Sequence, residues 1–261
     1  MGAKFLDWVD FFAAVLVLIR ITSFLAVSLF FSSMAIPAYA KIGLGVVMTL
    51  LIFPTVDHAG LGNLIENEWQ FMLLALKECL VGIIIGFTAA LVFSAITVAG
   101  ELVDLHMGFS MAGIFDPQTG SNVTLMGRFM YTLGILLFLA VDGHHSLLLA
   151  LSRSFEILPL GAAVLSRRIS VDMLIFFKEM FLLGFKIAAP LIAVMLISDL
   201  CLSLISRTVP QINVFIMGFP LKAGLGIIVL IIILPLFTAV ITGLVGQIER
   251  DLLQIMRGMG Q

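Results

Sequence analysis

The chain has 261 residues, 61% of them hydrophobic and 11% charged, with a formal net charge of −2 at pH 7. Soluble domains carry roughly a quarter charged residues, so this composition excludes a soluble globular protein and indicates an integral membrane protein. The slightly acidic balance argues against a nucleic-acid partner. The two cysteines, Cys79 and Cys201, stand alone in apolar runs and are interpreted as small apolar residues.

Apolar runs long enough to cross a membrane follow one another along the chain. A spanning helix needs about 20 mostly apolar residues. Runs of this kind cover 11–33, 40–56, 72–100, 123–141, 176–199 and 221–246. A further run, 144–165, contains charges and a proline, and we expect a re-entrant or amphipathic helix there. Apolar and polar residues do not alternate with period two in these runs, as they would in the strands of a membrane β-barrel. The sequence therefore predicts an all-α, polytopic membrane protein of one domain, 1–261. Its topology stays open because the Lys and Arg residues give no consistent orientation.

Small residues line one face of the run at 72–100. Gly82 and Gly86 form a GxxxG pattern that Ala90 and Ser94 continue at a spacing of four. Such a stripe lets another helix approach closely. The partner is either a helix of this chain or a neighbouring subunit.

Several charges fall within or at the ends of apolar runs, where they are costly unless they face protein or water. They are Arg20, Lys77, Glu78, Arg128, Lys186 and Asp199. Two more acids, Glu101 and Asp104, end the run at 72–100, where they oppose the helix dipole, so we expect a cation beside them. Buried ion pairs, interface contacts and an ion relay are the three possibilities for these groups.

An apolar, glycine-punctuated loop is predicted at 106–122. It reads GFSMAGIFDPQTG over 108–120 and contains the turn signal Asp116-Pro117. The loop rests at the lipid interface, packs under neighbouring helices, or fills a conduit, where apolar side chains can exclude water and ions. The residues that suit a seal are Gly108, Phe109, Met111, Gly113, Ile114 and Phe115.

Catalytic and metal-binding patterns are not apparent. In Asp142-Gly143-His144-His145 the adjacent histidines would point about 100° apart on a helix, a poor arrangement for one ion. No Walker A, HExxH or GxSxG pattern occurs in the sequence. We therefore expect no enzyme activity, no metal and no cofactor.

A second unusual segment, 207–222, reads RTVPQINVFIMGFPLK. Its prolines limit helix continuation, and we predict a broken helix bracketed by Pro210 and Pro220, a feature of transporters, channels and subunit contacts. The candidate residues are Arg207, Pro210, Gln211, Asn213, Phe215, Gly218, Pro220 and Lys222. The pattern K-x-G-L-G-x8-P occurs twice in the chain, starting at Lys41 and at Lys222, the last residue of this segment. These are either an internal repeat or two helices that begin alike.

Three stretches, 100–123, 138–161 and 207–222, together resemble the FliR family of flagellar biosynthetic proteins, which has relatives in injectisome type III secretion. The resemblance covers essentially the whole chain. It implies paired helical hairpins and membership of a helical, asymmetric export gate with FliP-like, FliQ-like and FlhB-like subunits.

The resemblance also implies roles for both unusual segments. Residues 108–115 match the family's channel plug, and 207–222 match a segment expected at subunit contacts near the gate entrance. We therefore expect a non-enzymatic, inner-membrane subunit at the flagellar basal body. Unfolded proteins would be exported through a channel that this subunit helps to form. The alternatives are an injectisome counterpart, a small-solute secondary transporter, and a membrane scaffold without a conduit.

Overall fold

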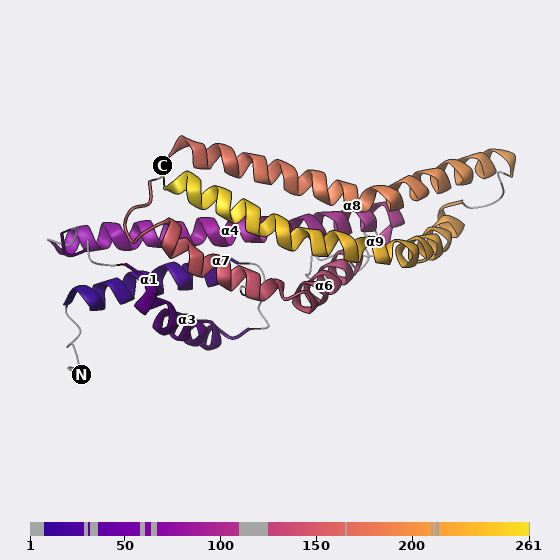
Figure 1. The fold of residues 1–261 in the computed structure, drawn as a ribbon. Helices are drawn as coiled ribbons and strands as arrows, with labels where there is room; N and C mark the ends of the chain where they lie inside the picture. The colour runs from indigo at the N-terminus through magenta and orange to yellow at the C-terminus, as the bar shows by residue number, and fades with distance from the viewer. Residues whose placement is uncertain are drawn as a thin grey trace. The chain divides into compact units, whose positions relative to one another are not determined.

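The computed structural model describes residues 8–28, 31, 36–57, 61–63, 67–109, 125–164, 166–209, 211 and 214–260. All regular structure in these ranges is helical (Figure 1). The α-helices are α1 (Trp8–Val27), α3 (Ala38–Ile52), α4 (Glu68–Met107), α6 (Leu125–Ala140), α7 (Gly143–Ile157), α8 (Arg167–Thr208) and α9 (Val214–Met259). Two short 3-10 helices, η1 (Phe53–Thr55) and η2 (Leu61–Asn63), lie between α3 and α4.

The helices confirm the prediction of an all-α, polytopic membrane protein. Within the described ranges five helical stretches are long and apolar enough to cross a membrane, and the bent pair formed by α6 and α7 would make a sixth span. Each predicted apolar run overlaps one of these helices. The run at 144–165 corresponds to α7. Asp142 stands at the N-cap of α7 with a left-handed backbone (φ 55°), and Gly143, His144 and His145 lie in the first turn of that helix.

The chain divides into two compact units. The first contains 1–91, 142–176 and 245–261, and the second contains 92–141 and 177–244. Three helices, α4, α8 and α9, supply residues to both units. The prediction of one domain stays a prediction.

Each unit has its own apolar core. In the first unit, the buried residues of α1 recur at the three- and four-residue spacing of one helix face. They are Ala13, Leu16, Val17, Arg20, Ile21, Phe24 and Leu25. In the second unit, Phe93 of α4 packs edge-on against Phe138 of α6, with ring centroids 4.8 Å apart. The outer side of α9 is apolar as well, with Ile231 and Ile232 exposed, which suits contact with lipid or another chain.

Candidate functional site

The two unusual segments meet at the first residues of the predicted loop. Helix α4 ends at Met107, and Gly108 follows with a positive φ of 84°, which glycine adopts without steric cost. The ring of Phe109 then lies edge-on against Phe219 in the first turns of α9, with centroids 5.9 Å apart. Gly108 faces the same ring. The start of the loop is therefore seated on the segment 207–222, and both belong to the second unit.

The other plug candidates, Met111, Gly113, Ile114 and Phe115, lie outside the described residues. The predicted role of these side chains in sealing a channel stays a prediction.

The segment 207–222 contains a helix break that is shorter than expected. Helix α8 ends at Thr208 and α9 begins at Val214. The expectation that Pro220 limits the break is wrong, because Pro220 lies inside α9. A proline removes only one main-chain hydrogen bond, and apolar membrane helices tolerate that loss when neighbouring groups compensate.

An ion pair and a close packing contact hold this connection. Lys222 of α9 pairs with Asp199 of α8, and Gly218 lies against Leu202, one helix turn from that acid. The exposed candidates are Arg207, Gln211 and Pro220. Pro210, Asn213 and the side chain of Phe215 lie outside the description.

A carboxylate that the sequence did not single out for this role lies at the base of the loop. The Asp104 side chain, fully buried, accepts hydrogen bonds at one oxygen from the backbone N–H groups of Met126 (2.8 Å) and Gly127 (2.9 Å). These groups belong to the first turn of α6. The expected cation beside Asp104 is therefore replaced by the positive end of a helix dipole, which stabilises a carboxylate in the same way. The available signal was an acid in the last turn of a helix, four residues before a turn glycine.

The small-residue stripe on α4 faces another helix of the same chain. A side chain at Gly82 would collide with the main chain of Arg20, and one at Gly86 would come within 2.9 Å of the Phe24 carbonyl oxygen. Both contacts are with α1. Further along the stripe Ala90 is buried and Ser94 half-buried. A role of the stripe at a subunit contact stays a prediction.

We expect Gly86→Leu to impair assembly more than membrane insertion. The leucine forces α1 away from α4, and overpacking of this kind costs about 1–3 kcal/mol or more, whereas the added apolar surface does not hinder insertion. The measurement is the amount of chain in membranes compared with the amount that co-purifies with the expected FliP-like and FliQ-like subunits. Gly43→Leu in α3 is the control, since a Cβ there meets nothing within 4 Å. Normal co-purification of the Gly86 variant would show that the close approach is dispensable.

The first unit contains a buried charge cluster. Arg20 and Glu78, both with fully buried side chains, form an ion pair of 2.5 Å. Arg20 also donates to the carbonyl oxygens of Ser154 (3.2 Å) and Leu158 (3.0 Å). The second Glu78 oxygen accepts from the Gly161 N–H at 2.8 Å. This cluster joins α1, α4, α7 and the segment after α7, so it has the geometry of a structural tie.

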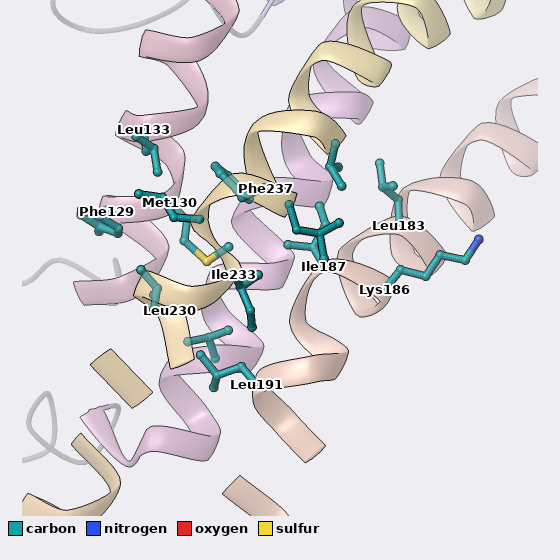
Figure 2. Close-up of a pocket in the computed structure, with 14 residues that line it drawn as sticks. Phe129, Met130, Leu133, Leu183, Lys186, Ile187, Leu191, Leu230, Ile233 and Phe237 are labelled. Carbon is teal, nitrogen blue, oxygen red and sulfur yellow. The ribbon is translucent and has the colours of Figure 1, made fainter. Parts of the chain in front are cut away.

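The second unit also contains an apolar cavity of about 180 Å³ (Figure 2). Side chains of α4, α6, α8 and α9 line it, including Val103, Met130 and Phe237. Among the described residues that line the cavity, Lys186 alone is charged, and its side chain points away from the apolar ones. Such a lining can accommodate an acyl chain or an apolar side chain. Within the described ranges, no group of three or more His, Cys, Asp or Glu residues could hold a metal ion.

Comparison with known proteins matches the chain to one family. The model of bacterial export proteins, family 1, covers residues 11–248. The flagellar biosynthetic protein FliR of Bacillus subtilis (strain 168) is 35% identical over 237 residues, which is 89% of this chain and 90% of that protein. The FliR proteins of Aquifex aeolicus (strain VF5) and Escherichia coli (strain K12) are 35% and 32% identical. Those two matches cover 84% of this chain, and 84% and 83% of the relatives.

Proposed function

Because the chain belongs to family 1 of the bacterial export proteins, together with the FliR proteins that it matches, we propose that it helps to form and to plug a protein-conducting channel. The chain is a membrane-embedded component of flagellar type III protein export. Our proposal adds that it works without catalysis, in the bacterial inner membrane, as a subunit of the export gate. Its partners there are FliP-like, FliQ-like and FlhB-like subunits, and unfolded proteins pass through the channel.

The observation that carries the proposal is the contact of Phe109 with Phe219. It supports a plug because it fixes the first apolar side chain of the loop on a helix of the same unit, so the loop leaves from a defined base. The apolar residues that follow, from Met111 to Phe115, are then the stopper. Apolar side chains in a narrow passage exclude water and, with it, ions. The segment 207–222 serves as the seat of this stopper and lies near the gate entrance.

Site-specific photo-cross-linking tests the proposal. A photoreactive amino acid at Phe109 is expected to cross-link to an exported protein that has been stalled during transit, because the stopper borders the path of the substrate. The same amino acid at Phe181 is the control, since Phe181 is an exposed phenylalanine of α8 in the same unit. Cross-links from position 181 but none from position 109 would place the loop outside the conduit.

A further inference from the structure

The apolar cavity of the second unit has a closed floor and an open rim. Its floor consists of buried side chains, which are Val103, Met130, Leu191 and Phe237. On its rim, Phe129, Leu234 and Leu236 are 46%, 38% and 58% exposed. All of these residues belong to the second unit. The cavity is therefore a slot that this unit builds by itself and that opens to the surroundings of the chain.

Two prolines mark the level of the slot in the hairpin of α8 and α9. Pro190 lies inside α8 and Pro235 inside α9, and both are sequence neighbours of residues that line the slot. The ion pair of Asp199 with Lys222 sets the register of these antiparallel helices. Lys186 precedes Asp199 by as many residues as Pro235 follows Lys222, so Lys186 and Pro235 are level. A proline disturbs the regular turn of a helix, and the close packing of α8 and α9 is interrupted at this level.

Lys186 places a positive charge at the mouth of the slot. Its side chain is exposed, and it points away from the apolar lining (Figure 2). In the part of the chain that the structure describes, its ammonium has no ion pair or hydrogen bond, whereas Lys222 of the same hairpin pairs with Asp199. A lysine can cover apolar surface with its methylene groups while the ammonium reaches a polar partner. A charge beside apolar surface is costly unless it faces water or an opposite charge, so the mouth of the slot favours an anion.

The slot itself is too apolar to hold water. Cavities of about 150 Å³ that are lined by apolar side chains stay dry and bind apolar molecules, and this cavity has a volume of about 180 Å³. An apolar occupant supplies the dispersion contacts that the lining side chains lack. An apolar protein side chain would fill the slot but leave Lys186 unpaired. The occupant that satisfies both features combines a long apolar chain with a negatively charged group, and in a membrane an anionic phospholipid has this chemistry.

We propose that this slot is a binding site for an anionic phospholipid. One acyl chain lies between α4, α6, α8 and α9, and the phosphate pairs with the ammonium of Lys186. The bound lipid joins all four helices of the second unit, because each of them contributes to the lining. The site does not depend on the loop at 106–122 or on its proposed role as a plug.

Photolabelling locates the acyl chain in the gate purified with the expected FliP-like and FliQ-like subunits. The probe is phosphatidylglycerol that carries a diazirine near the end of one acyl chain. We expect the label in peptides that cover 125–140 and 229–243, where Met130 and Phe237 form part of the floor. Val103→Phe fills the floor and should abolish this label, and Leu133→Phe, in the half-buried lining, replaces it if Val103→Phe prevents assembly. Label that persists in the filled variant, or that spreads evenly over the exposed faces of α8 and α9, overturns the site.

Substitutions of Lys186 test the contact with the phosphate. Native mass spectrometry of the same gate measures the preference for phosphatidylglycerol over phosphatidylcholine with the same acyl chains. Lys186→Gln should lower this preference about fivefold, which is the contribution of one lysine near anionic lipid, and Lys186→Arg should keep it. Lys178→Gln is the control, since Lys178 is an exposed lysine of α8 in the same unit and is not part of the lining. An unchanged preference in Lys186→Gln refutes the contact.

A photoreactive amino acid at position 186 distinguishes the lipid from a protein partner. We expect cross-links to phosphatidylglycerol in the assembled gate. If the cross-links go instead to another subunit, a helix of that subunit covers the slot and the lipid site is refuted.

Discussion

Deletion of residues 109–115 is expected to turn the closed, assembled gate into an ion-conducting pore. The deletion removes Phe109 together with the other proposed sealing side chains, Met111, Ile114 and Phe115. It also removes the aromatic contact with Phe219 that seats the loop. Without apolar side chains in the passage, water can fill it and ions follow. Conductance in planar bilayers should rise from the level of the bare bilayer to that of an open channel.

A replacement of the same seven residues by glycine and serine separates apolarity from length. If the seal depends on excluding water, this loop of unchanged length should leak as well. Phe219→Ala is expected to leak less than the deletion. It removes the ring on which Phe109 rests but leaves all the proposed sealing residues in the chain. A deletion variant that assembles normally and conducts no more than the parent gate contradicts the plug function.

Local sequence features predicted the class of fold and the position of each helix. The helices could be predicted from the apolar runs because the length and the low charge content of a run can be read from one continuous segment of sequence. The separate runs 123–141 and 144–165 indicated a break between them, whereas the left-handed backbone of Asp142 was not predicted. The continuation of α9 through Pro220 was also missed, because the local rule for proline ignores the compensation that neighbouring groups provide.

Contacts between distant residues could not be predicted from the sequence. Arg20 and Glu78 were each recognised as costly charges, but they are 58 residues apart and nothing local selects one partner over another. Asp104 was expected to need a cation, whereas its partners are main-chain N–H groups, which every residue except proline carries and which no side-chain pattern reveals. The meeting of Phe109 with Phe219 likewise depends on how α4 and α9 pack in the second unit.

Substitution of Arg20 by methionine is expected to destabilise the first unit strongly. The change leaves Glu78 buried with one remaining hydrogen bond, from Gly161, and removes a guanidinium that lies 4.4 Å from the centre of the Phe155 ring. Removing one partner of a buried ion pair costs about 3–5 kcal/mol, because the other charge stays buried without compensation. The measurement is the loss of folded protein on heating or in denaturant, in detergent, with the gate subunits present.

Arg153→Met is the matched control for this prediction. Arg153 and Glu249 also form an Arg–Glu pair, at 3.0 Å, but their side chains are 45% and 46% exposed. Exposed pairs contribute about 0–1 kcal/mol, so this variant should be close to the parent in stability. The double variant Arg20→Met with Glu78→Met should regain much of the loss, because an apolar pair can replace a buried ion pair at little cost. Equal stability of Arg20→Met and Arg153→Met would mean that the Arg20 cluster does not tie α1, α4 and α7 together.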